Sequence, residues 1–464
     1  MKLKDLHIVY FIGIGGIGMS AIARWFNQHG VSVHGYDRAE TPLTKVLNEE
    51  GIAIHYEDNV DLLPDELKKD KTGSLIVYTP AIPKDHKEFN YLLDAGYEMM
   101  KRSQVLGLIT KNTFTVAVAG THGKTTTSSM VAHLLKNSGR DIAAFLGGLT
   151  TNYNSNFIIN EELNDQTISV VEADEFDRSF LTLFPDMAII TSMDADHLDI
   201  YGDKESLRES FGDFICQIKE GGYLFINDNI EYKGLAEDAL CVPASYGINR
   251  GQFFAVNLRI SGDTFVFDFS SKGRLIEGLS LCVPGYHNVE NMVAAIAVAT
   301  QLGLNEKEIK EGVASYRGVK RRFEYVHKKD GVIYIDDYAH HPTEITAFLK
   351  SVKEMYADKN VLAIFQPHLY SRTRDFASDF SKSLSLADEV LLLDIYPARE
   401  LPISGVTSEL LFKNINTTKH MCKMEDVLKT LDDKEIEVIV TLGAGDINQL
   451  VKPIKEYLTN RYSA

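Results

Sequence analysis

Short hydrophobic runs recur along this chain, and most of them end in a glycine-rich or charged segment. Residues 8–12 (IVYFI), 74–78 (SLIVY) and 113–118 (TFTVAV) are rich in β-branched and aromatic side chains, as is typical of buried strands. Between such runs, apolar residues recur at helical spacing, for example over 130–135. This alternation of strands and helices predicts an α/β protein built on parallel sheets.

The first strand leads into a phosphate-binding pattern. Gly13, Gly15 and Gly18 form G-x-G-x-x-G after the strand, a helix follows, and the next strand ends in Asp37. Such glycines let backbone N–H groups approach a diphosphate at a helix N-terminus, and an acid at this distance often binds a ribose. Taken alone, the pattern predicts an NAD-dependent oxidoreductase, although the same turn serves any nucleotide diphosphate.

A second phosphate-type turn lies at 113–127 (TFTVAVAGTHGKTTT), again between a strand and a helix. Its glycines allow backbone N–H groups to close on an anion, Lys124 supplies a charge for the β- and γ-phosphates, and the Thr125 hydroxyl can reach Mg²⁺. Val118 stands where the full Walker pattern has glycine, so only the looser G-x-x-G-K-T remains. The alternative is an ordinary glycine turn between a core strand and a helix. In either case we expect the Lys124 ammonium to be exposed to solvent.

Acidic residues follow the next two predicted strands, at 167–171 and 186–191. Because ligands collect at the carboxyl ends of parallel strands, these clusters could face the Lys124 turn and hold Mg²⁺. The alternative is that the acids merely solvate the strand ends of an acidic protein. The residues concerned are Glu172, Asp174, Glu175, Asp177, Asp194, Asp196, His197 and Asp199.

Later segments complete the strand and helix pattern. Residues 222–229 and the β-rich stretch 253–283 predict antiparallel strands that decorate the central domain. His287, Asn288 and Asn291 begin a helix, where the amides could bind an adenine edge or simply cap the helix.

From about residue 323 the alternation of strands and polar loops returns, which predicts a second doubly wound sheet. So many polar groups at successive strand ends favour a functional site. They are Asp336, Asp337, His340, His341, His368, Arg372 and Arg374.

Length and composition narrow the class of protein. A chain of 464 residues predicts about three domains. The 48 basic and 65 acidic residues give a net charge of −17, which argues against non-specific binding to nucleic acid or anionic membranes. The four scattered cysteines indicate free thiols in a reducing cytosol. Without a signal peptide or an apolar run near the roughly 18 residues of a membrane span, we expect a cytoplasmic protein.

The order of these motifs resembles that of the Mur ligases of bacterial peptidoglycan synthesis. The resemblance covers essentially the whole chain and implies three domains: a Rossmann-like UDP-sugar-binding domain (1–110), a central P-loop ATPase-like domain with a parallel sheet and a small antiparallel sheet (111–322), and a Rossmann-like C-terminal domain (323–464). The motifs that carry it are GIGGIGMS, GTHGKTTT, EADE, DADHLD, HNVEN, RRF, DDYAHHPTE and FQPHLYSRT.

The resemblance implies an ATP-dependent ligase that joins L-alanine to the carboxylate of UDP-N-acetylmuramate through an acyl phosphate. It would act as a monomer or weak dimer in cell wall biogenesis, with no nucleic acid or membrane partner. A murein tripeptide recycling ligase is the nearest alternative. An NAD-dependent oxidoreductase or a non-catalytic nucleotide switch would leave much of the chain unexplained.

The resemblance also implies roles for individual residues. The UDP diphosphate would bind at Gly15, Gly16, Ile17 and Gly18, with Asp37 and Thr41 near the uridine. ATP would bind at Gly120, Thr121, His122, Gly123, Lys124, Thr125 and Thr126, with Asn288 and Asn291 beside it, and Mg²⁺ at Thr125, Glu172 and His197. His340, His368 and Arg372 would contact substrate, and Lys124, Glu172, His197, Arg322, Asp337 and His341 would be catalytic. Phe211 stands near the position where sister enzymes carry a carbamylated lysine, so no such bridge is expected.

Overall fold

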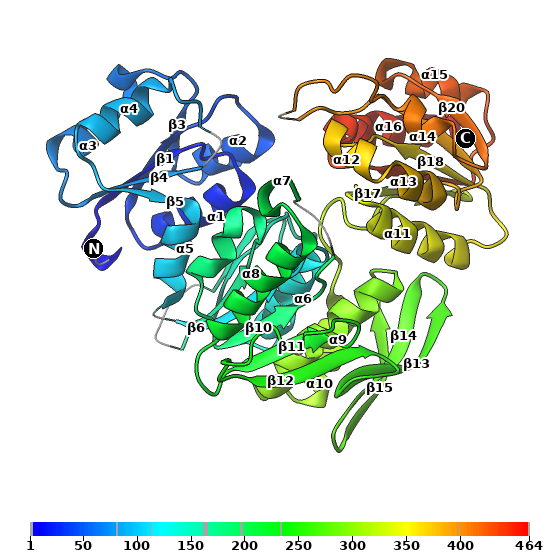
Figure 1. Ribbon diagram of the computed structural model, residues 1–464, viewed down its shortest axis with the longest axis horizontal. Helices are drawn as coiled ribbons and strands as arrows, with labels where there is room; N and C mark the ends of the chain where they lie inside the picture. The colour runs from blue at the N-terminus through cyan, green and yellow to red at the C-terminus, as the bar shows by residue number, and fades with distance from the viewer. Residues whose placement is uncertain are drawn as a thin grey trace. The chain divides into compact units, whose positions relative to one another are not determined.

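The computed structural model describes residues 3–462, apart from 80–81, 112, 161–165, 195–197, 233 and 399. The described residues form three sheets flanked by helices (Figure 1), which confirms the predicted α/β class. Two compact units divide the chain. The first unit is Met1–Ala255, Phe269–Ile276 and Glu290–Val313, and the second is Val256–Asp268, Glu277–Val289 and Ala314–Ala464. Among the described residues, no helix has the length and apolar character needed to cross a membrane.

The N-terminal sheet is parallel throughout, in the order β3-β2-β1-β4-β5. Its strands are β1 (Ile8–Ile12), β2 (Ser32–Tyr36), β3 (Ala53–His55), β4 (Ser74–Tyr78) and β5 (Met99–Lys101), and its helices are α1 (Ile17–Gln28), α2 (Pro42–Glu49), α3 (Asp65–Lys69), α4 (Lys87–Asp94) and α5 (Arg102–Lys111).

Successive β1 side chains point to opposite faces of this sheet. Val9 and Phe11 pack in one hydrophobic cluster with residues of α1 and α5, and Tyr10 packs in another with residues of α3 and α4. Helices on both faces explain why every β1 residue is buried.

The central sheet has the order β15-β14-β13-β12-β11-β10-β6-β9-β7-β8. Its strands are β6 (Phe114–Ala119), β7 (Ile142–Phe145), β8 (Phe157–Ile159), β9 (Ile168–Glu172), β10 (Met187–Ile190), β11 (Tyr223–Asn227), β12 (Val242–Ile248), β13 (Phe253–Ser261), β14 (Thr264–Ser271) and β15 (Arg274–Leu281). The helices that follow them are α6 (Lys124–Asn137), α7 (Leu198–Tyr201), α8 (Lys204–Cys216), α9 (Tyr286–Gln301) and α10 (Glu306–Ser315).

Two strands in this sheet depart from the predicted antiparallel pairing: one is β13, which pairs in parallel with β12, and the other is β11. β11 was expected to be antiparallel, but it pairs in parallel with β10. The reason is that α8 returns the chain across the sheet between the two strands, as a parallel connection requires. By contrast, two-residue connections join β13, β14 and β15, and connections this short permit only antiparallel pairing.

The C-terminal sheet has the order β16-β17-β21-β18-β19-β20, and β16 alone among its described pairs runs antiparallel to its neighbour. It is the doubly wound sheet predicted from about residue 323. Its strands are β16 (Glu324–Lys329), β17 (Val332–Asp337), β18 (Val361–Phe365), β19 (Glu389–Leu392), β20 (Thr418–Met421) and β21 (Val438–Leu442). Its helices are α11 (Pro342–Met355), α12 (Tyr370–Asp375), α13 (Ala377–Leu384), α14 (Glu409–Phe412), α15 (Val427–Asp432) and α16 (Val451–Tyr462).

Candidate functional site

The first glycine turn closes onto the acid that follows β2. The Gly15 N–H donates to Asp37 Oδ2 at 2.7 Å. A Cβ on Gly15 would lie only 2.8 Å from that oxygen, so a side chain at this position would push the loop off the carboxylate. α1 begins at Ile17, and no side chain caps its N-terminus. Its first N–H groups are therefore available to an anion, as expected of a diphosphate-binding turn.

Thr41 begins the neighbouring helix α2. Its hydroxyl accepts from the Thr44 N–H at 3.2 Å, and the Thr44 hydroxyl accepts from the Thr41 N–H at 2.9 Å. This reciprocal pair is a capping box. In this structure Thr41 therefore stabilises the start of a helix, and its predicted role near the uridine stays a prediction.

A cavity of about 320 Å³ lies beside the first turn, within the first unit. One wall is the turn itself, and another includes the acidic end of β9. The lining includes Gly16, Ile17, Gly18, Thr79, Arg102, Gly147, Glu172 and Asp174. The cavity thus brings the predicted diphosphate turn together with one predicted metal ligand, Glu172.

Arg102 is a residue of this cavity that the sequence patterns did not identify. A Cβ on Gly18 would lie 2.8 Å from Arg102 Nη1, and the guanidinium lies 3.9 Å from the Asp174 carboxylate. The arginine therefore provides a positive charge directly beside the glycine turn. Arg102 directly follows β5, which places it beside the turn. β5 has only three residues, and no hydrophobic pattern in the sequence predicts it.

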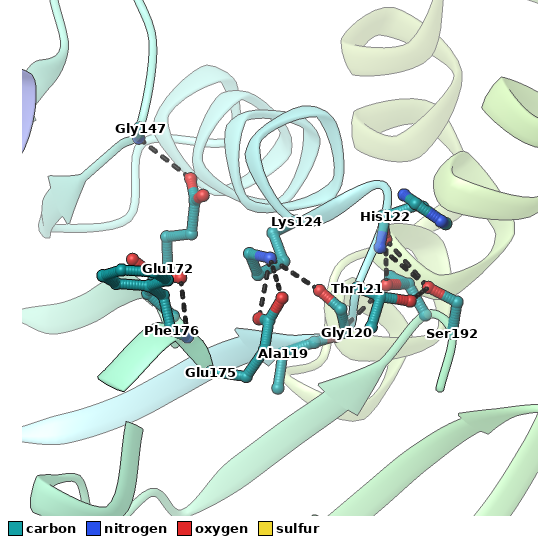
Figure 2. A network of polar contacts seen from close by, with 12 residues as sticks. Ala119, Gly120, Thr121, His122, Lys124, Gly147, Glu172, Glu175, Phe176 and Ser192 are labelled. Atoms are coloured by element: carbon teal, nitrogen blue, oxygen red, sulfur yellow. Dashed lines mark hydrogen bonds and ion pairs between the residues drawn. The ribbon is translucent and has the colours of Figure 1, made fainter. Parts of the chain in front are cut away.

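The second glycine turn is held by the end of β10. Gly120 has φ +134°, and a Cβ there would lie 2.1 Å from Thr191 Oγ1, so this position requires glycine. The Ser192 hydroxyl lies 2.9 Å from Thr121 Oγ1 and accepts from the His122 N–H at 2.8 Å (Figure 2). Ser192 thereby fixes the turn from the neighbouring strand.

Lys124 lies at the centre of a polar network (Figure 2). Its ammonium donates to the Gly120 carbonyl at 2.7 Å and to both Glu175 carboxylate oxygens at 2.9 and 2.7 Å. The Lys124 side chain is 12% exposed and that of Glu175 is 0% exposed. The expectation that Lys124 is exposed is therefore wrong, because the acidic end of β9 covers it.

The carboxylates around Lys124 determine its protonation state. Burial lowers the pKa of Lys124, but the carboxylates of Glu175, Asp174 and Glu172 outweigh burial and leave the pKa raised. Lys124 is therefore an ammonium at neutral pH, as a phosphate ligand should be.

Thr125 and Glu172 place two oxygens together at the start of α6. The Thr125 hydroxyl donates to Glu172 Oε1 at 3.1 Å, and Glu172 Oε2 accepts from the Gly147 N–H at 2.9 Å. Hard oxygen atoms of this kind fit Mg²⁺. The third predicted ligand, His197, lies outside the described residues. Within the described part of the chain, no group of three or more His, Cys, Asp or Glu residues could hold a metal.

The predicted adenine-side residues lie on α9, and Thr126 lies on α6. A Cβ on Gly123 would lie 3.0 Å from Asn291 Oδ1, so this amide adjoins the second turn. Asn288 precedes Asn291 by one turn, and its side chain donates to the Pro284 carbonyl at 2.6 Å. Thr126 is buried within its helix.

Asp337 begins a second group of predicted site residues, in the second unit. Its carboxylate accepts from the Phe323 and Ala339 N–H groups, both at 2.7 Å. Burial raises the pKa of Asp337 to about 7, although Arg322 lowers it. The Arg322 guanidinium lies 5.1 Å from the centre of the Tyr338 ring. Arg322 therefore lies close enough to Asp337, at the end of β17, to act on its charge, and the catalytic role of both residues stays a prediction.

The histidines of this group divide into two kinds. The His340 and His368 rings are 6.0 Å apart, and His368 stacks on Tyr396 at 5.7 Å, a residue that the motifs did not single out. His341 instead caps α11, where its Nδ1 accepts from the Thr343 N–H at 3.4 Å. Arg372 lies on α12 with 9% of its surface exposed.

Comparison with known families covers most of the chain. Residues 8–113 match the description "Mur ligase family, catalytic domain", residues 118–299 match "Mur ligase middle domain", and residues 321–447 match "Mur ligase, glutamate ligase domain".

Individual relatives match over their full length. The UDP-N-acetylmuramate–L-alanine ligase of Flavobacterium psychrophilum is 49% identical over 462 residues, which is 99% of this chain and 100% of the relative. The enzyme of that name from Christiangramia forsetii is 48% identical over 461 residues, covering 98% and 99%.

Among solved structures, the UDP-N-acetylmuramate-alanine ligase of Thermotoga maritima superposes with a TM-score of 0.80 at 28% identity, covering 97% of this chain and 99% of that one. A murein peptide ligase of Psychrobacter arcticus shares the fold, with a TM-score of 0.69 at 23% identity, covering 98% and 99%. The family predicted from the motifs is confirmed by this similarity. The chain belongs to the Mur ligase family.

Proposed function

We propose that this protein is an ATP-dependent, ADP-forming ligase that joins L-alanine to the carboxylate of UDP-N-acetylmuramate. The observation that carries the proposal is the buried Lys124 ammonium in a glycine turn, beside the Thr125 and Glu172 oxygens. A buried cation at such a turn has a role in phosphoryl transfer and none in hydride transfer. Relatives that are 48–49% identical over the whole chain carry the corresponding name.

The chemistry requires an activated carboxylate, because a free carboxylate is a poor acylating agent. Transfer of the ATP γ-phosphoryl group makes an acyl phosphate. The L-alanine amine then attacks it, and phosphate leaves as the amide forms. Lys124 offsets negative charge on the phosphoryl group as it moves, and Arg322 is assigned the same role.

We assign the binding of each substrate to a part of the chain. The UDP-sugar diphosphate binds the first turn at Gly15–Gly18 and Arg102, and ATP binds at Gly120–Thr126. Residues Asp337, His340, His368 and Arg372 serve the acceptor amino acid. These assignments follow the division into 1–110, 111–322 and 323–464. The proposed place of action is the cytoplasm, where these precursors are assembled.

Mg²⁺ belongs to the proposal through the chemistry of its donors. Thr125 and Glu172 offer hydroxyl and carboxylate oxygens within 3.1 Å of each other, and His197 is assigned as the third ligand. When bound, the ion would neutralise phosphate charge, and substrate phosphates would complete its coordination.

The test is substrate-dependent release of ADP and phosphate by the purified protein. We expect release only when ATP, Mg²⁺, UDP-N-acetylmuramate and L-alanine are all present. Glycine and L-serine should be poorer acceptors. Because a methyl group is worth only about 1–3 kcal/mol of discrimination, the preference over glycine should be finite.

Other outcomes would identify the alternatives. ATP turnover that requires a free tripeptide and ignores L-alanine would indicate a recycling ligase. Consumption of a nicotinamide cofactor without ADP formation would contradict the ligase proposal altogether. Nucleotide binding without turnover on any carboxylate would indicate a binding switch.

A further inference from the structure

Asn156 is a fully buried amide between the start of α1 and the strand pair β7–β8, all within the first unit. Its Nδ2 donates to the Ile17 carbonyl at 2.6 Å and to the Ser20 hydroxyl at 3.0 Å. Ile17 is the first residue of α1, directly after the glycine turn. An amide of the central segment therefore holds the helix end assigned to the diphosphate.

The opposite side of the same amide is fixed by Arg24. The Arg24 guanidinium donates to Asn156 Oδ1, and it also pairs with Glu50 at 2.7 and 2.9 Å. Because the oxygen of Asn156 accepts and its nitrogen donates, the amide has a single orientation. Asn156 thus uses both of its polar atoms on α1 and none on solvent.

The backbone around Asn156 leads to the second turn. The Leu146 N–H donates to the Asn156 carbonyl at 2.9 Å, and the next residue, Gly147, donates to Glu172 Oε2 at 2.9 Å. Glu172 in turn accepts from the Thr125 hydroxyl at 3.1 Å. Hydrogen bonds and one peptide link therefore connect the start of α1 with the residues assigned to Mg²⁺.

The same elements enclose the cavity of about 320 Å³. Ile17 and Gly18 line one part of it, and Gly147 and Glu172 line another. Phe145 of β7 and Phe157 of β8 pack in one hydrophobic cluster with Met19 and Ile22 of α1. Apolar side chains therefore surround the buried Asn156 amide where α1 meets β7 and β8. Hydrophobic packing is non-directional, whereas a buried amide with three fixed partners sets one register.

We propose that Asn156 is a positioning residue that couples the UDP-sugar site to the nucleotide site, by holding the α1 N-terminus in register with Glu172. The proposal rests on the proposed function, because it takes the first turn as the UDP-sugar site. Binding of nucleotide and Mg²⁺ orders Thr125, Glu172 and the Gly147 loop. Because Asn156 hydrogen-bonds to both segments, this ordering also fixes the N-terminus of α1, which binds the diphosphate. Each ligand therefore strengthens binding of the other.

The test uses the isosteric variant Asn156→Asp. An aspartate keeps the oxygen that accepts from Arg24, but it loses the N–H groups that donate to Ile17 and Ser20. The matched control is Asn160→Asp, beyond the end of β8, whose Nδ2 donates to the Arg140 carbonyl at 3.2 Å and not to α1. Calorimetry on the full-length protein would measure UDP-N-acetylmuramate affinity with and without AMP-PNP and Mg²⁺.

In the unaltered protein and in Asn160→Asp, we expect the nucleotide analogue to increase UDP-sugar affinity by about fivefold or more. In Asn156→Asp, UDP-sugar affinity should fall about tenfold, and the increase caused by the analogue should disappear. Affinity for the analogue alone should stay within about twofold of the unaltered protein, which a general loss of folding would not allow.

Two further outcomes keep the inference separate from the proposed function. If the unaltered protein fails to bind UDP-N-acetylmuramate at all, the proposed function fails. If it binds but shows no coupling, or if Asn156→Asp keeps full coupling, the role of Asn156 is overturned. Should Asn156→Asp not fold, Ser20→Ala decides, because it removes one partner of the amide; unchanged coupling in Ser20→Ala would also overturn the inference.

Discussion

The two glycine turns of the first unit share a backbone plan but differ in the charges around them. Each connects a buried parallel strand to a helix whose first N–H groups can meet an anion. The first turn closes onto a carboxylate, Asp37, and takes its nearby cation from Arg102. The second carries its own cation, Lys124, paired with the buried Glu175. A turn that only binds a diphosphate needs hydrogen-bond donors. A turn that takes part in phosphoryl transfer also needs a positive charge beside the phosphoryl group.

The Lys124–Glu175 pair also explains how the second turn remains stable without a phosphate. A buried ammonium without a counter-ion would be costly, and Glu175 supplies that counter-ion. When ATP binds, the phosphate oxygens can take over as partners of Lys124. The first turn needs no such counter-ion, because Asp37 accepts from a backbone N–H group and does not neutralise a buried charge.

The largest expected effect is that of Lys124→Ala. Turnover should fall about a hundredfold or more, because electrostatic terms of this kind reach that size, while UDP-sugar binding should persist. Stability should fall too, because the variant removes the ammonium that pairs with the buried Glu175 carboxylate, and breaking comparable buried pairs costs about 3–5 kcal/mol. Steady-state kinetics and thermal unfolding would measure both.

A double variant separates the two effects of this lysine. Lys124→Ala with Glu175→Gln also removes the buried charge of Glu175, so the thermal midpoint should recover while turnover stays low. Recovery of turnover in the double variant would show that Lys124 acts only as a structural partner of Glu175. The contrast between the two turns would then disappear.

The next largest effect concerns Glu172, which lines the cavity beside the first turn and accepts a hydrogen bond from Thr125, next to the second turn. Glu172→Gln keeps the shape of the side chain but removes the charge that would attract Mg²⁺. We expect the Mg²⁺ concentration for half-maximal turnover to rise about tenfold or more, with little change in binding of the UDP-sugar alone. A titration with an unchanged midpoint would show that Glu172 only positions Gly147 and Thr125.

Sequence patterns predicted the parts of this molecule that local chemistry determines. Hydrophobic runs, and the glycine-rich or charged segments that end them, predicted three features. They are the strands of the sheet cores, both glycine turns and the C-terminal doubly wound sheet. Short strands such as β5 and β20 carry little pattern because they are brief and partly exposed. The orientation of β11 depended on the path of α8, which a strand pattern does not encode.

The same limit applies to the site. Lys124 was identified by its motif, but its burial depends on Glu175, which lies 51 residues further along the chain. Arg102, the first residue of α5, lies beside the first turn, and Ser192, just after β10, holds the second; no local sequence pattern marks either residue. The fold class and family were therefore predictable, whereas the charge balance of each turn required the packed structure.

Arg102→Ala should have an intermediate effect and sharpen the contrast with Lys124. The guanidinium lies beside Gly18 and can offset the diphosphate charge, but it is assigned no part in phosphoryl transfer. We expect KM for UDP-N-acetylmuramate to rise about tenfold with kcat nearly unchanged, the pattern of lost uniform binding. A fall in kcat as large as that of Lys124→Ala would show that the first turn also contributes to the chemical step.

The smallest expected effect is that of Asp37→Asn. The asparagine oxygen can still accept from the Gly15 N–H, so the first turn should stay closed, but a neutral acceptor makes a weaker bond than a carboxylate. Loss of the negative charge also removes repulsion toward the diphosphate, and the two changes oppose each other. UDP-sugar affinity should therefore change by no more than about threefold. Asp37→Ala, which leaves the Gly15 N–H without its acceptor, should weaken binding more. If Asp37→Asn instead lost affinity a hundredfold, the carboxylate would have to bind the substrate itself, and the first turn would depend on a charged side chain as the second turn does.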